Sequence, residues 1–396
     1  MKYYELDNIL TKKAHYNFII GERSNGKTTA LLRHIVRDYY ETGRRGAIIR
    51  QMEEDIKGHK GASLFSGMIE GGMIDELTDG DYQGVKYFNR AYYLGKQDEK
   101  GNWNYEKEPF AHIFALSQSL HYKSNSYPNV GTIMFDEFMR HDHVYLVDEV
   151  SLFLNLVSTI VREKAEATIF LVANTVSWNS PYFKTFGLKN VSQMKPGDLA
   201  TVEFKRKRPT GVEIATTIAI EYCENTAEYG GKASDVYFNV DDVRVTDMIT
   251  DGSFAVANYP KCPHHFTAKN VKLTCWILAD ETILRCRLMK VGREVFFFVD
   301  AIKQFVKLPG ETIGTMQPDR ERYEALRDKR RDIVYSLEFS SDPTHFTNPA
   351  APYADRRTRW MPEALRANRI FFESNEAGEE LMYYIALATK RSVAAL

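Results

Sequence analysis

Short apolar runs alternate with longer amphipathic stretches through the first half of the chain. The apolar runs predict strands at Asn17–Ile20, Ala47–Arg50, His112–Leu116, Thr132–Phe135 and Thr168–Ala173. Between the last two, apolar residues from Leu146 to Val161 recur at helical spacing. Residues 85–105 interrupt this order with two aromatic runs around a short turn, which predicts a hairpin insertion. Strands that alternate with helices favour an α/β domain, with a mostly parallel sheet covered by helices on both faces.

The pattern changes near residue 196, where Pro-Gly-Asp predicts a turn and weakly periodic sequence follows. Strand-like runs separated by short gaps return at Val271–Leu278, Thr282–Leu288 and Val295–Val299. Such short gaps predict hairpins and therefore an antiparallel or mixed sheet. Helical patterns follow at 319–332, 362–368 and 377–390. We expect a first domain at 1–200, a linker at 201–265 and a smaller α+β domain at 266–396.

Composition refines this picture only slightly. The 396 residues are 44% hydrophobic with a formal net charge of −1, so no overall basic excess indicates nucleic-acid binding. Residues 211–260 hold nine acidic and two basic residues, whereas 261–396 hold 22 basic and 18 acidic residues. The four cysteines form no C-x-x-C pair, and no apolar run is long enough to cross a bilayer. We expect an intracellular protein with reduced thiols, no signal peptide and no membrane partner.

The most specific motif is the segment GERSNGKT, residues 21–28, which fits the phosphate-binding pattern G-x-x-x-x-G-K-[ST]. A predicted strand precedes it and a predicted helix follows it, as such a loop requires. Lys27 is expected to reach the β- and γ-phosphates of ATP, and the Thr28 hydroxyl to coordinate Mg²⁺. The candidate nucleotide ligands are Gly21, Arg23, Asn25, Gly26, Lys27, Thr28 and Thr29.

A second motif is formed by Asp136 and Glu137, which follow the predicted strand Thr132–Phe135. Parallel sheets bind ligands at the carboxyl ends of their strands, so Asp136 is expected to hold Mg²⁺ together with Thr28. Glu137 is the candidate general base toward water, which favours hydrolysis over transfer to a small molecule. A buried strand that ends in two solvated acids is the alternative interpretation.

Four positions are candidates for contacts to the γ-phosphate because of their place in the sequence. Asn174 ends the next predicted strand, where a polar side chain can contact both the γ-phosphate and the water, although asparagine also starts ordinary turns. Phosphoryl transfer gains from an arginine supplied in cis or by a neighbouring subunit. Arg23, Arg140 and Arg162 are candidates for that role, and an exposed surface arginine is the alternative for Arg162.

With these residues in place, the chain resembles the viral genome-packaging ATPases of the phi-twenty-nine type of small tailed phages. The resemblance covers about the first 185 residues and is carried by the segments 18–28, 123–130 running into 132–138, 159–162, and 173–183. Residues 123–130, KSNSYPNV, carry most weight, because a general ATPase has no need of this sequence before its acidic strand.

The resemblance implies a P-loop ATPase of the ASCE branch, which has an additional strand and a catalytic glutamate. It implies a homomeric ring, pentameric in this family, that docks on the capsid portal and uses ATP to pull in double-stranded DNA. The location would be the host cytoplasm, with transient docking on the procapsid; a structural RNA adaptor stays open. By the resemblance, Lys27 is the P-loop lysine, Asp136 the metal-binding acid and Glu137 the catalytic glutamate. Arg162 is the trans-acting arginine, Lys123 the second trans-acting basic residue and Arg23 the P-loop arginine.

The loop that would contact DNA differs from that of the family. Glu53 stands where the relative has a lysine thought to face DNA, so Lys57 or Lys60 from the same loop is the candidate replacement. A flexible surface loop is the alternative interpretation of this segment.

The second domain departs from the family's nucleases as well. Packaging motors often carry an RNase H-like nuclease there, whose chemistry needs carboxylates that converge on two metal ions. The predicted strand 272–278 contains no acid, and Asp280, Glu281 and Asp300 stand only at strand ends. We therefore expect a degenerate domain that binds nucleic acid without cutting it, with the basic clusters 327–331 and 356–359 as candidate contacts.

Two other functions stay open at this point. A P-loop phosphotransferase would need a lid arginine pair and a closed acceptor pocket for its small-molecule substrate. A non-catalytic, nucleotide-gated assembly protein would tolerate Glu137→Gln, whereas a motor would stall with ATP bound.

Overall fold

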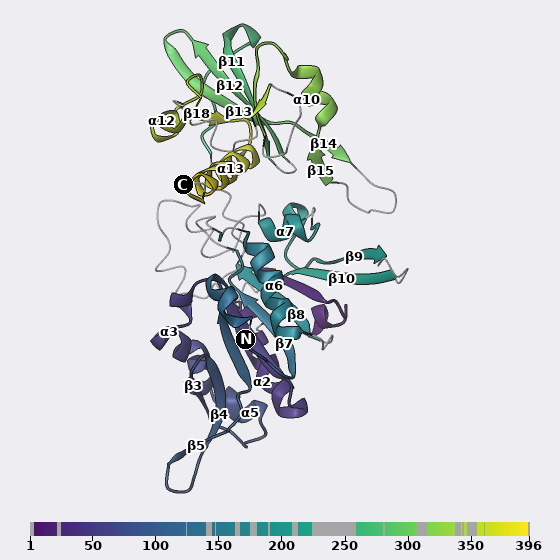
Figure 1. Ribbon diagram of the computed structural model, residues 1–396, viewed down its shortest axis with the longest axis vertical. Helices are drawn as coiled ribbons and strands as arrows, with labels where there is room; N and C mark the ends of the chain where they lie inside the picture. The colour runs from purple at the N-terminus through teal and green to yellow at the C-terminus, as the bar shows by residue number, and fades with distance from the viewer. Residues whose placement is uncertain are drawn as a thin grey trace. The chain divides into compact units, whose positions relative to one another are not determined.

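The chain divides into two units, Met1–Ala255 and Val256–Leu396, in the computed structural model (Figure 1). The structure describes residues 4–21, 25–123, 125–139, 145–146, 148–162, 167–174, 180–188, 191–207, 213–223, 259–279, 282–306, 315–336, 342, 344–346, 355–359 and 361–394. Each unit contains its own sheet and its own buried core. Within these residues, none of the helices combines the length and the hydropathy needed to cross a membrane.

The N-terminal unit is organised around one large sheet, with the strand order β3-β4-β6-β2-β7-β8-β1-β10-β9. Its parallel strands are β1 (Tyr16–Gly21), β2 (Arg45–Arg50), β6 (Ala111–Ala115), β7 (Val130–Asp136), β8 (Thr168–Asn174) and β10 (Glu213–Tyr222). The strands predicted from the apolar runs are confirmed. The mixed α/β fold with a parallel sheet is confirmed with them.

The expected hairpin insertion is also confirmed. It consists of β3 (Gly84–Phe88), β4 (Ala91–Gln97) and β5 (Trp103–Tyr105), which pair antiparallel to one another at one side of the sheet. Asn89 and Arg90 form its tight turn with φ angles of 49° and 60°, respectively, a backbone that favours asparagine over most residues.

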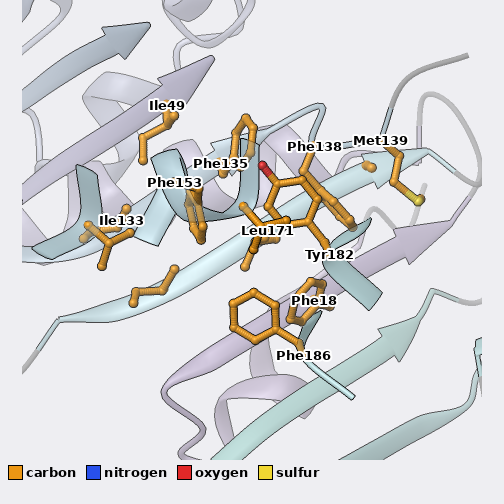
Figure 2. Packing of buried hydrophobic residues seen from close by; sticks show 14 of the residues in the cluster. Phe18, Ile49, Ile133, Phe135, Phe138, Met139, Phe153, Leu171, Tyr182 and Phe186 are labelled. Atoms are coloured by element: carbon orange, nitrogen blue, oxygen red, sulfur yellow. The ribbon is translucent and has the colours of Figure 1, made fainter. Parts of the chain in front are cut away.

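Helices cover both faces of this sheet. On one face, α2 (Lys27–Thr42), α4 (Ser66–Glu70) and α5 (Met73–Leu77) pack on alternate strand residues such as Ile19 and Ile48. On the other face, α6 (Glu149–Val161) and α7 (Pro181–Thr185) pack on the intervening residues. Figure 2 shows this second core, where Phe18, Phe138 and Tyr182 meet edge to face. Two buried faces explain why the parallel strands are nearly continuous apolar runs.

The sheet continues past residue 200, where the sequence placed the end of the first domain. β9 (Leu199–Lys207) and β10 form an antiparallel pair, and β10 also pairs with β1 over Tyr16–Ile20. In β10 only the second half, from Ile218 on, is buried, so its exposed first half hid the strand pattern from the sequence. Part of the expected linker therefore belongs to the sheet that carries the phosphate-binding loop.

The C-terminal unit contains a second sheet, with the order β17-β16-β11-β12-β13-β18. The strands are β11 (Val271–Ala279), β12 (Thr282–Val291), β13 (Glu294–Ala301), β16 (Ile333–Ser336), β17 (His345–Phe346) and β18 (Ile370–Phe372). β11, β12 and β13 are antiparallel neighbours, β16 is parallel to β11, and β17 is parallel to β16. Cys275 and Ile277 of β11 face α12 (Met361–Arg366) and α13 (Asn375–Ala394), while Trp276 and Leu278 face α10 (Arg320–Leu326).

One predicted helix of this unit is shorter than expected. The helix expected at 319–332 ends at Leu326, and β16 begins at Ile333. Asp328 accepts from the N–H of Arg330, and Asp332 accepts from the N–H of Asp328, so these acids bond local backbone and form a turn instead of helix.

The remaining elements are short. They are α1 (Asp7–Leu10), α3 (Gly58–Ala62), β14 (Lys303–Val306), β15 (Thr315–Pro318) and the 3₁₀ segments Glu53–Asp55, Ser63–Phe65, Leu116–Tyr122, Val191–Gln193 and Ala268–Asn270.

Candidate active site

The phosphate-binding motif lies between β1 and α2. β1 ends at Gly21 and α2 begins at Lys27, with Gly26 as its N-cap at a φ of 90°. This left-handed backbone is easily reached only by glycine. Glycine has no side chain with which to cap the first-turn N–H groups of α2, and such groups at the start of a long helix are a binding site for anions. The motif thus has the strand–loop–helix setting that the sequence predicted.

Lys27 joins this loop to the neighbouring strand. Its Nζ donates to Asn25 Oδ1 at 2.9 Å and to Asn174 Oδ1 at 3.3 Å, and the lysine is buried. Asn174 reaches it because β1 and β8 are parallel neighbours in which Gly21 pairs with Asn174. The structure therefore brings together three predicted site residues from two distant parts of the sequence.

The acidic motif meets the loop from the strand beyond β8. Thr28 Oγ1 donates to Asp136 Oδ1 at 3.0 Å, across 108 positions of sequence. Asp136 is 3% exposed, whereas the side chain of Glu137 is 66% exposed. Glu137 has a φ of 60°, an uncommon backbone for a residue other than glycine that turns the chain sharply as it leaves β7. Burial therefore separates the two acids into a recessed metal-ligand candidate and an accessible base candidate.

Arg50 at the end of β2 contacts both acids, and sequence reasoning missed it. Its guanidinium lies 2.6 Å from Asp136 Oδ2 and donates to Glu137 Oε2 at 2.8 Å. Burial raises the pKa of Asp136, and the charge of Arg50 opposes that rise. The sequence did place Arg50 at the end of a predicted strand. Only the pairing of Ile49 with Phe135, however, brings Arg50 beside β7.

Glu149 is a second residue that the sequence did not single out. This buried carboxylate at the start of α6 accepts from Gln51 Nε2, from the Leu146 N–H at 2.6 Å and from the Tyr182 hydroxyl at 3.0 Å. Gln51 directly follows Arg50, so Glu149 ties α6 and α7 to the loop that leaves the acidic site. A buried and fully bonded carboxylate of this kind fixes the geometry of the elements around it.

Arg162 and Lys123 lie together but away from Lys27. Arg162 donates to the backbone carbonyls of Lys123 at 3.0 Å and Asn125 at 2.6 Å. α6 starts beside Gln51, and its 13 residues rise about 20 Å, so Arg162 lies at the far end of that helix from the acids. The two basic residues thus share one surface that is remote from the chain's own phosphate-binding loop.

The remaining predicted residues are placed as follows. Thr29 lies in the first turn of α2, and Arg23 and Arg140 lie outside the described residues. Glu53 is paired with Arg90 at 2.7 Å and Lys57 at 3.0 Å. Lys60 is paired with Asp55 at 3.1 Å. The candidate DNA-facing lysines are therefore in exposed pairs, which hold them weakly.

In this site, a loop before a helix faces an acid at the end of a parallel strand, and that strand lies two strands away from β1 in the sheet. This arrangement defines an α/β protein of the P-loop class. Residues 1–196 match the model of the Podovirus DNA encapsidation protein (Gp16) family. This match confirms the resemblance to packaging proteins of small tailed phages over the N-terminal part of the chain.

Curated relatives agree with the family match over the same half. The chain is 29% identical over 188 residues to the DNA packaging protein of Bacillus phage phi29, which is 47% of this chain and 50% of the relative. It is 29% identical over 174 residues to that of Bacillus phage B103, covering 43% of this chain and 48% of the relative. The chain thus spans about half the length of the curated relatives that it matches.

Two solved structures are similar over nearly the whole chain. The Phi-28 gp11 DNA packaging motor superposes with a TM-score of 0.54 at 16% identity, covering 98% of both chains. The bacteriophage Phi-29 viral genome packaging motor assembly gives a TM-score of 0.52 at 17% identity over 96% of this chain and 99% of that one. At this identity the likeness shows a shared fold.

Proposed function

We propose that the protein is an ATP-hydrolysing ring motor that translocates double-stranded viral DNA into a preformed capsid. The observation that carries this proposal is the joint placement of Lys27 against Asn174 and of Thr28 against Asp136. The match of residues 1–196 to a DNA encapsidation family supports the assignment of the substrate. The small-molecule phosphotransferase and the non-catalytic assembly protein have no observation in their favour.

The residues of the site fit a magnesium-bound ATP. A helix start with a glycine N-cap offers N–H groups to phosphate, Lys27 offers a buried positive charge, and the Thr28–Asp136 pair offers two oxygen ligands for Mg²⁺. When bound, the nucleotide and metal supply the transferable phosphoryl group and the charge that stabilises it. Glu137 would then take the proton of the attacking water, and Asn174 would hold the end of β8 against the same lysine.

Arg50 would act as a positioning residue for these acids. In the contacts described, one guanidinium neutralises Asp136 and holds Glu137. Glu137 can orient water only when this contact is released, so Arg50 would keep the base inactive until metal and phosphate engage Asp136. The strand order also supports the ASCE branch, because β8 lies between the loop strand β1 and the acidic strand β7.

The position of Arg162 supports a ring. An arginine about 20 Å along α6 from its own acids cannot serve the chain's own site without large rearrangement, but it can serve a neighbour's. Lys123 on the same surface would act with it. On the ground of the resemblance alone, we propose a pentameric ring that docks on a portal in the host cytoplasm. A structural RNA would rest on the same ground and is not part of the proposal.

For the C-terminal unit we propose a degenerate RNase H-like domain. The order β13-β12-β11-β16-β17, with three antiparallel strands followed by two parallel ones, supports that fold. Asp300, the acid that a nuclease would use, is held by Arg285 at 2.6 Å and Arg287 at 2.8 Å. Two guanidiniums on one buried carboxylate leave it poorly suited to a metal, which supports nucleic-acid binding without cleavage. Asp280 and Glu281 lie outside the described residues.

The proposal is tested by ATP turnover of the assembled protein with and without linear duplex DNA. We expect DNA to stimulate the wild type. Glu137→Gln should bind ATP but lose turnover. Full turnover by isolated monomer without DNA would contradict the ring motor, and Glu137→Gln with unchanged turnover would contradict the assigned base.

A further inference from the structure

The hairpin insertion β3–β4–β5, at the outer edge of the N-terminal sheet, has one face rich in exposed aromatic rings (Figure 1). Val85 and Tyr87 of β3 pack on the buried core, so the alternate residues Lys86 and Phe88 face the other way. Three aromatic side chains of the hairpin are exposed to water: Phe88 by 62%, Trp103 by 42% and Tyr105 by 38%. Large apolar side chains that gather on a surface indicate a place where a ligand or partner binds.

Two glycines let the rings of Trp103 and Tyr105 lie flat on this sheet. A Cβ on Gly84 would come within 2.5 Å of the Trp103 ring, and a Cβ on Gly95 would come equally close to the Tyr105 ring. The two ring planes differ by only 13°, and their centroids are 5.9 Å apart. Trp103 and Tyr105 therefore form one nearly flat aromatic platform, with its inner side on the glycines and its outer side toward water.

Lys86 places a positive charge at this platform. Its Nζ lies 5.1 Å from the centroid of the Tyr105 ring and 5.6 Å from that of Phe88. Two acids of the hairpin are bonded elsewhere, because Glu106 accepts from a tyrosine hydroxyl and Asp98 accepts from backbone N–H groups of its own turn. Residues 84–107 hold five basic and three acidic residues, so the hairpin has a net charge of +2. This balance favours an anionic ligand.

Flat rings beside an ammonium suit nucleobases joined by phosphates. Every base has a flat π-face that stacks on an aromatic ring, and the ammonium can bind the phosphate between two bases. Bases of a duplex are about 3.4 Å apart along each strand, whereas the centroids of Trp103 and Tyr105 are 5.9 Å apart. Two bases that each lie on one ring must therefore be unstacked from one another. This spacing favours a single strand over a duplex.

We propose that this face of the hairpin binds single-stranded DNA, with Trp103 and Tyr105 stacking on bases and Lys86 contacting phosphate. The choice of DNA over RNA rests on the proposed motor function, because stacking does not read the sugar. Unpaired bases occur at the ends of linear DNA, where terminal base pairs open. The platform would thus give the motor a contact to a DNA end that is distinct from its contacts to the duplex.

The test measures the affinity of the full chain for a fluorescein-labelled oligothymidylate of about 12 nucleotides by fluorescence anisotropy, without ATP. Trp103→Leu and Tyr105→Leu keep an apolar side chain over the glycines but remove the π-face. Each should lose about 5- to 150-fold in affinity, the range measured for base–aromatic stacking. Trp103→Phe keeps an aromatic ring and should stay within about threefold of wild type.

The matched control is Phe305→Leu, because Phe305 is also 62% exposed but lies on β14 of the C-terminal unit. This control should bind the oligonucleotide as the wild type does. Circular dichroism melting of each variant checks that the fold is retained.

Lys86→Met tests the phosphate contact separately. Removing one contact to a single strand should lower the slope of log affinity against log salt concentration by about 0.7. A slope equal to that of the wild type would overturn the role of Lys86.

Three results would overturn the assignment: unchanged affinity in both leucine variants, an equal loss in Trp103→Phe and Trp103→Leu, or tighter binding of a duplex of the same length. Tighter binding of an RNA oligomer of that length would overturn the choice of DNA. ATP turnover of the wild type separates this proposal from the motor. If the wild type hydrolyses ATP but does not bind the single strand, only the platform is wrong. If it binds the strand but hydrolyses no ATP, the ATPase assignment is wrong and the platform stands.

Discussion

Both units of this protein pair arginine with a buried carboxylate on a neighbouring strand, but the ratio of arginines to acids is opposite. In the N-terminal unit, the single guanidinium of Arg50 serves two acids, Asp136 and Glu137. In the C-terminal unit, the guanidiniums of Arg285 and Arg287 serve the single acid Asp300. An excess of carboxylate attracts a metal ion, whereas an excess of guanidinium repels one. Under the proposed function, the N-terminal acids would serve metal-dependent chemistry, whereas the C-terminal ion pair joins neighbouring strands.

The largest expected effect comes from Arg162→Ala, which tests whether the N-terminal site is completed by a neighbour. A trans-acting arginine contributes about 10³–10⁵ in turnover, so the assembled variant should lose activity on that scale while retaining ATP binding. The measurement is steady-state ATP hydrolysis by assembled rings. Mixing Arg162→Ala with Glu137→Gln subunits should restore part of the activity, because some interfaces then combine an intact base with an intact arginine. No recovery on mixing would contradict a trans role.

A matched pair of amide substitutions tests the comparison directly. Glu137→Gln should lower turnover by about 10²–10⁴, the contribution of a general base. Asp300→Asn makes a similar change in the C-terminal unit and should leave turnover per assembled ring unchanged. Equal losses in the two variants would show that the units do not differ in the way proposed.

For the same two variants, the effects on the free energy of unfolding should rank in the opposite order to the effects on turnover. Asp300→Asn leaves two half-buried arginines against a neutral amide, and breaking a buried pair costs up to about 3–5 kcal/mol. The measurement is chemical denaturation of both variants. Glu137→Gln alters an exposed side chain and should change the free energy of unfolding by less than about 0.5 kcal/mol. A stability loss confined to Glu137→Gln would contradict this assignment.

The smallest expected effect is a shift in pH dependence on replacing Arg50. Burial raises the pKa of Asp136, so its metal-binding charged form is lost as pH falls at a higher pH than for an ordinary aspartate. Arg50 opposes this rise, and Arg50→Met should therefore move the acidic limb of the kcat/KM profile to still higher pH. Arg45→Met is the control, because Arg45 starts the same strand and pairs with Glu108. A shift toward lower pH would contradict the electrostatic role of Arg50.

Local patterns predicted the strands and the two motifs, because apolar runs and short motifs are properties of contiguous residues. Lys27 and Asp136 were identified in this way. Arg50 and Glu149 were missed, since their roles depend on β2 lying beside β7 and on α6 starting beside Gln51. Such neighbours arise from the strand order, which no local pattern contains.

The second half of the chain was harder to predict for related reasons. β10 is only half buried, so its pattern is weak, yet it joins the N-terminal sheet through β1. The helical pattern at 319–332 predicted a longer helix than the structure has. There, Asp328 and Asp332 bond local backbone groups, which competes with helix formation.

Magnesium-ATP binding between the P-loop and β7 is the central requirement of the proposed motor. The decisive measurement is an electron-density map of the protein with Mg²⁺ and a non-hydrolysable ATP analogue. We expect the metal between Thr28 and Asp136, the terminal phosphates at Lys27, and Glu137 released from Arg50. Density for the nucleotide elsewhere, or a metal that does not contact Asp136, would contradict it.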